Sequence, residues 1–267
     1  MTTLPVALVQ TAASTDSGTQ RARLAQWADQ LLSGPEPRPG LVVLPEAVMH
    51  DFGATDHDIA SVAEPLDGPF VSAVAAQARR LEAVVVAGMF ERGDAGRRPY
   101  NTLIALGPDG SLVGVSRKVH LYDSFGYRES NRLQAGPVEP MVVPVGPLTL
   151  GLMTCYDLRF PEYARLLVDA GADTLVVPAA WVRGPLKEDH WTTLLRARAI
   201  ENTAYVLAAA QTGPSYCGRS QAVDPSGVVV AGAGDGEAVV RARLDAARVA
   251  TVRTDNPALT HRRIRIG

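Results

Sequence analysis

Three chemically reactive side chains share one position relative to the predicted strands. Glu46, Lys118 and Cys155 each stand just past the end of a strand-like apolar run. The ends of strands converge in space, so an acid, a cation and a thiol are expected to meet at one edge of a sheet. Taken singly, each residue has an ordinary interpretation, the two charges as solvated surface groups and the thiol as a small buried hydrophobe.

In combination, the three side chains point to nucleophilic catalysis. A thiol with an ordinary pKa of about 8.5 is mostly protonated at neutral pH, and a neighbouring carboxylate that accepts its proton makes it a nucleophile. An ammonium group beside the thiol stabilises the oxyanion of a tetrahedral intermediate and offsets the charge on the acid. The pattern therefore predicts Cys155 as the nucleophile, activated by Glu46 and assisted by Lys118.

The elements that must position these residues alternate between strand and helix patterns. One-faced helical spacing occurs at residues 24–31, 71–78 and 163–170. The helix-like segment 188–202 carries Arg196, Arg198 and Glu201 beside apolar residues, so we expect it to be buried against a partner with its charges paired. The polar, aromatic stretch 119–132 fits neither period and is interpreted as a loop over a site. We expect a mixed sheet system with helices on its outer faces, either one open sheet or two stacked sheets. The predicted strands are residues 4–10, 41–44, 83–89, 102–106, 112–116, 148–154, 174–178, 204–210, 220–223, 228–231 and 238–242.

Composition limits the class of protein. The 267 residues show no composition break, so we expect a single domain over 1–267, with the basic segment 256–267 as a surface arm. A net charge of -2 argues against nucleic acid or an anionic membrane as a partner. No signal peptide or membrane span is evident, which predicts a cytoplasmic protein.

The remaining candidates for chemistry have ordinary interpretations. The only cysteines, Cys155 and Cys217, are predicted to be free thiols, and Cys217 lies in a stretch without an acid and a cation, so we interpret it as non-catalytic. A metal could bind at His50, Asp51, Asp56, His57 and Asp58, but a polar loop after the strand explains these residues better. We therefore expect neither a metal nor a cofactor.

Several motifs in this sequence resemble the nitrilase superfamily of carbon-nitrogen hydrolases. They are Pro45-Glu46, RKVHL at 117–121, CYDLRFPE at 155–162, His190-Trp191 and RARAIEN at 196–202. The likeness covers nearly the whole chain, in the right order. It implies an α/β fold, an αββα sandwich of two mixed β-sheets flanked by helices, and a thioester between Cys155 and the acyl group of the substrate.

The resemblance also implies roles for individual residues. Glu46 would be the general base, Lys118 would stabilise the tetrahedral intermediate, and the amide of Tyr156 would complete the oxyanion hole. Family members often carry a second structural or catalytic glutamate between the lysine and the cysteine, and Glu129 is the matching candidate.

The CYDLRFPE motif looks most like the branch of omega-amidases and deaminated-glutathione amidases, so hydrolysis of a small amide to acid and ammonia outranks attack on a nitrile. Arg159 stands where carbamoyl-hydrolysing relatives place an arginine that binds a substrate carboxylate, with an ion pair holding the next helix as the alternative. Tyr122 and Trp181 are expected either in the substrate pocket or in the core. The stretch 181–187, WVRGPLK, departs from the omega-amidase pattern.

Two alternatives to the amidase stay open at this point. A nitrilase or N-carbamoyl hydrolase is the alternative within the superfamily, and a non-catalytic relative that binds a small ligand is the alternative outside the enzyme class. The expected partner is a small-molecule amide. By the resemblance, the helices over 161–170 and 188–202 predict a homodimer or a higher homo-oligomer.

Overall fold

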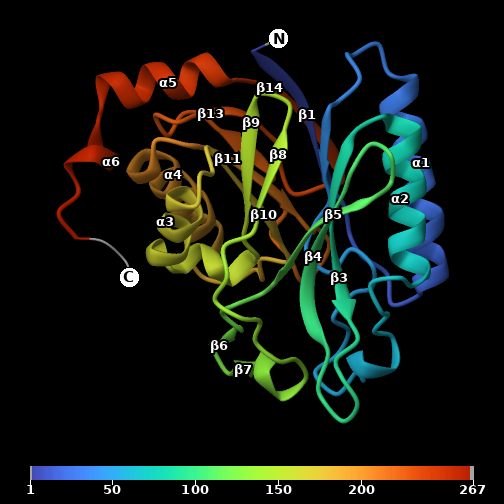
Figure 1. Ribbon diagram of the computed structural model, residues 1–267. Coiled ribbons are helices and arrows are strands. Elements are labelled where there is room, and N and C mark those ends of the chain that lie inside the picture. Colours follow the sequence, from blue (N-terminus) through green and yellow to red (C-terminus); the bar gives the residue numbers. More distant parts are fainter. Residues whose placement is uncertain (1, 265–267) are drawn as a thin grey trace.

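The computed structural model describes residues 2–264 and shows a layered α/β sandwich (Figure 1). Two six-stranded sheets face each other in the middle. Helices α1 (Ser17–Ser33) and α2 (Pro69–Leu81) cover the outer face of one sheet, and α3 (Pro161–Asp169) and α4 (Lys187–Asn202) cover the other. The predicted αββα sandwich is confirmed, and the two sheets are stacked rather than joined into one.

The first sheet has the strand order β14-β1-β2-β3-β4-β5. Its three strands β1, β2 and β3 run parallel, and the neighbours on either side pair antiparallel. The strands are β1 (Thr3–Gln10), β2 (Leu41–Val43), β3 (Val84–Glu91), β4 (Tyr100–Leu106), β5 (Leu112–Arg117) and β14 (Ala238–Asp245).

The second sheet has the order β13-β12-β11-β10-β9-β8. Here β9, β10 and β11 are parallel, and β8, β12 and β13 pair antiparallel at the sides. Every residue of β10 and β11 is buried, as expected of parallel strands covered on both faces. The strands are β8 (Val142–Val145), β9 (Leu148–Leu152), β10 (Thr174–Ala179), β11 (Tyr205–Ala210), β12 (Gln221–Val223) and β13 (Val229–Gly232).

Apolar side chains fill three interfaces between the layers. Leu8 and Val86 of the first sheet belong to one cluster with Leu150 and Val176 of the second, which holds the two sheets together. The other two clusters lie between each sheet and its helices. The packed sheets therefore provide a rigid frame whose strand ends hold their residues in fixed positions.

The structure adds elements to those predicted and extends others. Strand β8 and helix α5 (Ala246–Asp255) were not expected, and β14 extends to Asp245. The predicted loop 119–132 contains the short antiparallel pair β6 (Asp123–Ser124) and β7 (Tyr127–Arg128), followed by a 3₁₀ turn over Glu129–Asn131.

The last described residues lie beside the α3 and α4 layer. Helix α6 (Ala258–His261) follows α5, and Arg262 pairs with Asp169 of α3 at 2.6 Å. The final residues 265–267 of the predicted arm lie outside the described residues. Within residues 2–264, no helix combines the length and apolarity needed to cross a bilayer.

Candidate active site

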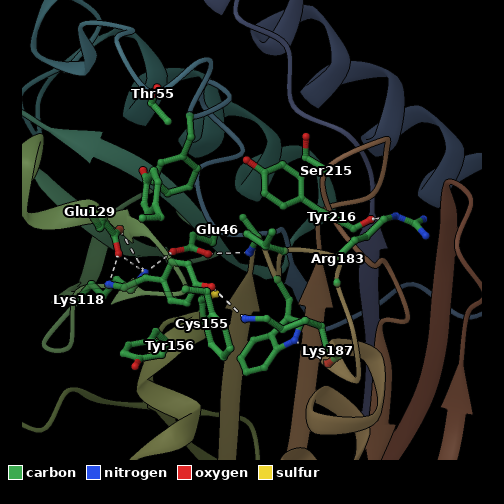
Figure 2. Close-up of a pocket in the computed structure, with 18 of the residues that line it drawn as sticks. Glu46, Thr55, Lys118, Glu129, Cys155, Tyr156, Arg183, Lys187, Ser215 and Tyr216 are labelled. Atoms are coloured by element: carbon green, nitrogen blue, oxygen red, sulfur yellow. Dashed lines mark hydrogen bonds and ion pairs between the residues drawn. The ribbon is translucent and has the colours of Figure 1, made fainter.

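The ends of strands from both sheets meet at one edge of the sandwich, where Glu46, Lys118 and Cys155 point toward one another (Figure 2). Glu46 follows β2, Lys118 follows β5, and Cys155 follows β9. All three are buried, with relative exposures of 1%, 3% and 8%. The first sheet thus contributes the acid and the cation, and the second contributes the thiol.

A buried network connects two carboxylates through one ammonium and one amide. The Lys118 Nζ donates to Glu46 Oε1 and to Glu129 Oε2, both at 2.9 Å. Asn101 Nδ2 donates to Glu46 Oε1 at 2.8 Å and to Glu129 Oε1 at 3.1 Å. Buried charges are tolerated when they are paired and hydrogen-bonded, and this network meets both conditions.

The backbone around Glu46 is fixed from several sides. The amide of Ala180, which directly follows β10, donates to Glu46 Oε2 at 2.6 Å, and Gln211 Nε2 donates to the Glu46 carbonyl at 2.8 Å. On β3, a Cβ at Gly88 would lie 2.4 Å from the Ala47 nitrogen. Only glycine at position 88 therefore lets β3 pass this close behind the acid.

Cys155 begins a 3₁₀ turn over Cys155–Arg159 and has a left-handed backbone, with φ of 45°. Asp157 caps this turn, because its Oδ2 accepts from the Thr154 amide at 3.0 Å. Its Oδ1 accepts from the His120 amide at 2.9 Å and contacts His120 Nδ1 at 2.8 Å. One buried carboxylate thereby joins the turn that carries the thiol to the segment that follows Lys118.

The surroundings of Cys155 favour the protonated thiol. Burial raises the pKa of the Cys155 thiol well above its ordinary value, and the contacting Glu46 carboxylate raises it further against the opposing effect of Lys118. Burial disfavours the charged Lys118, but Glu129 and Glu46 outweigh it and raise the pKa of the ammonium well above its ordinary value. The resting site therefore holds a neutral thiol beside an ammonium that stays charged.

A cavity of about 490 Å³ opens over the thiol. Aromatic rings, Phe52 and Tyr216 among them, form much of its wall. The second cysteine, Cys217, is absent from this lining and lies fully buried in the cluster between the second sheet and its helices. All the candidate residues predicted from the sequence line the cavity: Glu46, Lys118, Tyr122, Glu129, Cys155, Tyr156, Arg159 and Trp181.

Sequence reasoning missed two polar residues of this site. Asn101 is completely buried, and nothing in the neighbouring sequence distinguishes it from an ordinary polar residue at the start of a strand. Lys187 lines the cavity, and its Nζ donates to the Tyr122 hydroxyl at 2.9 Å. It belongs to the 181–187 stretch that departs from the omega-amidase pattern, which was its only signal.

The metal alternative at the polar loop is not needed to explain its residues. His50 and His57 stack with ring centroids 5.0 Å apart, and Asp51 accepts from the Gly53 amide at 2.7 Å. These contacts are those of a structured loop, which matches the interpretation favoured from the sequence.

Comparison with known proteins places the chain in a family. The family model for carbon-nitrogen hydrolase matches residues 5–254. A deaminated glutathione amidase of Escherichia coli is 41% identical over 226 residues, covering 84% of each chain. One of Bos taurus is 39% identical over 243 residues, covering 84% of this chain and 72% of the relative.

A solved structure agrees with the fold. Nit3 of Saccharomyces cerevisiae, described as a member of branch 10 of the nitrilase superfamily, superposes with a TM-score of 0.86 at 30% identity. The match covers 98% of this chain and 97% of Nit3. The resemblance inferred from the motifs is confirmed: the chain belongs to the carbon-nitrogen hydrolase family.

Proposed function

We propose that this carbon-nitrogen hydrolase cleaves a small amide bearing a carboxylate, releasing acid and ammonia through a thioester on Cys155. The family and the amidases among its relatives support the reaction class. The observation that carries the proposal is the paired Glu46, Lys118 and Glu129 network beside a thiol at the floor of a cavity. Such an arrangement supplies a base, an electrostatic partner and a nucleophile in one dry site.

Acylation begins with proton transfer from the Cys155 Sγ to the Glu46 carboxylate, which frees an electron pair for attack on the amide carbon. The oxyanion that forms faces the Lys118 ammonium and the Tyr156 N–H, since the first N–H groups of a helical turn lack acceptors within it. Glu46 then returns the proton to the departing nitrogen. The carbon-nitrogen bond breaks, ammonia leaves, and the acyl group remains on sulfur.

Deacylation repeats these steps with water. Glu46 takes a proton from the water, whose oxygen attacks the thioester carbon, and the proton then passes to the leaving sulfur. Glu129 keeps Lys118 in place and also accepts from the Tyr122 amide at 2.7 Å, so it connects the network to the cavity wall. Its role in this scheme is positioning rather than proton transfer.

The surroundings of Arg159 support the proposal that the substrate carries a carboxylate. The ion pairs within residues 2–264 include none that involves Arg159, so the alternative of a salt bridge to the next helix gains no support. Its guanidinium carbon lies 5.0 Å from the Trp181 ring centroid, on the cavity wall. A guanidinium at this place is suited to a carboxylate.

Ammonia release by wild type and by Cys155→Ala tests the proposal, with Cys217→Ala as the matched control. Wild type should accumulate a covalent acyl adduct, visible by intact-protein mass spectrometry, and Cys155→Ala should lose both the adduct and the activity. Full activity in Cys155→Ala would rule out the mechanism.

A second assay separates the alternative functions. Ammonia release from an amide, a nitrile and a carbamoyl compound, measured in parallel, distinguishes an amidase from a nitrilase and a carbamoylase. Inactivity on all three favours the protein that only binds a small ligand.

We also propose that the protein forms a homodimer through α3 and α4. On α4, Ile200 is 46% exposed, and the neighbouring turn leads to Val228 and Val230, which are 56% and 51% exposed. An exposed apolar patch of this kind favours association. The buried Arg198 gives no support, since it donates to the Leu158 carbonyl and pairs with Glu201 inside the chain. Sedimentation showing only monomer at micromolar concentration would contradict the dimer.

A further inference from the structure

We propose that Arg159 and Lys187 together bind one carboxylate of the substrate, and that Lys187 selects anionic over neutral amides. The inference rests on the proposed amidase function and names the residue that recognises the substrate's charge. The first observation is that the cations lining the cavity differ in the partners that they have.

Most of these cations already have partners. Lys118 is paired with two carboxylates, Arg132 donates to the Phe52 carbonyl at 2.9 Å, and Arg183 donates to the Tyr216 carbonyl at 2.8 Å and lies 3.5 Å from a carboxylate oxygen of Asp235. The ion pairs of residues 2–264 include neither Arg159 nor Lys187. Arg132 has no ion pair either, but it also donates to the carbonyls of Ala54 and His57. Among the cations that line the cavity, only Arg159 and Lys187 therefore have neither a carboxylate nor a carbonyl partner within the described residues.

Lys187 is held in a setting that disfavours its charge. The residue is 6% exposed, and its Nζ lies 3.5 Å from the Phe125 ring centroid and donates to the Tyr122 hydroxyl. Burial lowers the pKa of Lys187, and the positive charge of Arg159 lowers it further. An anion between the two cations would relieve both effects.

Arg159 has donor capacity to spare. Its Nε is buried, and the described residues offer it no hydrogen-bond partner. Its Nη2 contacts His190 Nδ1 at 3.3 Å, which is a long contact rather than an ion pair. A buried unsatisfied donor is costly, so a ligand that accepts from it is favoured.

The local backbone keeps Lys187 at the cavity. Leu186 has a left-handed backbone with φ of 60°, and Trp181 Nε1 donates to the Lys187 carbonyl at 2.8 Å. The 181–187 stretch therefore bends back on itself and fixes the lysine at the start of α4 (Figure 2). The segment that departs from the omega-amidase pattern is the one that builds this site.

The carboxylate must belong to the acyl part of the substrate. Ammonia is the leaving group in the proposed reaction, so every other atom of a primary amide stays on the acyl side. Lys187 and Cys155 line the same cavity, so the cation lies in the same chamber as the nucleophile. A short ω-carboxylate amide meets both requirements.

The test compares glutaramate with valeramide, an amide of the same chain length that lacks the carboxylate. Lys187→Met should lower kcat/KM for glutaramate by about 10- to 100-fold, the size expected for loss of a charge-assisted hydrogen bond. The quantity that tests the proposal is the ratio of kcat/KM for glutaramate to kcat/KM for valeramide, which should fall by about 10-fold or more in Lys187→Met. Lys187→Arg should restore most of the glutaramate activity. The exposed Arg80→Met, which removes one positive charge on the far side of the first sheet, controls for net charge.

Equal losses on both substrates, or no loss on either, would overturn the proposal. A binding experiment keeps this result separate from failure of the proposed chemistry. Glutarate should bind to Cys155→Ala in isothermal titration calorimetry about 10- to 100-fold more tightly than to Cys155→Ala/Lys187→Met. Equal affinities would reject the site even if the amidase mechanism is correct. Inactivity of wild type on both amides, with the difference in glutarate affinity present, would reject the mechanism and keep the site.

Discussion

The two cysteines of this protein are both free and buried, but their surroundings differ. Burial raises the pKa of both thiols, that of Cys217 to about 12 and that of Cys155 well above its ordinary value. Cys217 Sγ contacts the Gly218 carbonyl at 3.4 Å inside a packed cluster. Cys155 instead borders a cavity and the Glu46 carboxylate. A low resting pKa therefore does not distinguish the candidate nucleophile here, whereas contact with a base does.

The largest expected effect comes from removing Glu46, the base that distinguishes the surroundings of Cys155 from those of Cys217. Glu46→Gln keeps a side chain of the same shape, but its amide cannot accept a proton, so both acylation and deacylation lose their proton carrier. We expect kcat/KM for amide hydrolysis to fall by about 10⁴-fold. Ammonia release under steady-state conditions measures the loss.

A control distinguishes loss of proton transfer from loss of the folded structure. Glu46→Gln should keep its fold, because Lys118 retains its bond to Glu129, and a urea unfolding curve checks this. A Glu46→Gln enzyme with more than a tenth of wild-type activity would show that another group accepts the thiol proton.

The second prediction removes the cation. Lys118→Met leaves Glu46 and Glu129 buried without a positive partner, so one of them must take up a proton or water must enter. We expect the free energy of unfolding to fall by about 3 kcal/mol, as when one partner of a buried pair is deleted. Chemical denaturation at pH 7.5 measures the change.

A double variant identifies the cause. Lys118→Met/Glu129→Gln removes one positive and one negative charge, so only one of the two unpaired carboxylates of the single variant remains. It should regain part of the stability while staying inactive, because in the proposed mechanism Lys118 also faces the oxyanion. If the double variant is no more stable than the single one, lost packing of the lysine chain rather than charge explains the destabilisation.

The three residues at the strand ends could be predicted from the sequence because each lies next to its apolar run in the chain. Apolar runs end at Glu46, Lys118 and Cys155, and the sheets bring those ends together without needing further information. Asn101 was missed because its function depends on β4 lying beside β5, a pairing that places one amide between two carboxylates from distant parts of the chain. No local pattern records such a contact.

The missed elements also have physical causes. Strand β8 carries Pro144, which breaks the usual strand pattern and is tolerated because β8 is at the edge of its sheet. Helix α5 buries only Val249 and Val252, so its apolar face is too narrow to stand out. Lys187 follows a Gly-Pro pair that indicates an exposed loop, and only the left-handed Leu186 and the bond from Trp181 turn it inward.

The smallest predicted effect is on the pH dependence of the unfolding free energy, and it comes from the buried thiol of Cys217. The pKa of Cys217 is about 12 in the folded protein against an ordinary 9.0, so above pH 9 the unfolded chain releases this proton before the folded protein does. The stabilisation is complete below pH 9 and is lost as the pH rises toward about 12. Between pH 7.5 and pH 10, wild type should lose about 1.4 kcal/mol more unfolding free energy than Cys217→Ala, which has no thiol to titrate there. Urea midpoints of both proteins at the two pH values measure this difference, and parallel pH dependences would mean that solvent reaches Cys217 in the folded state.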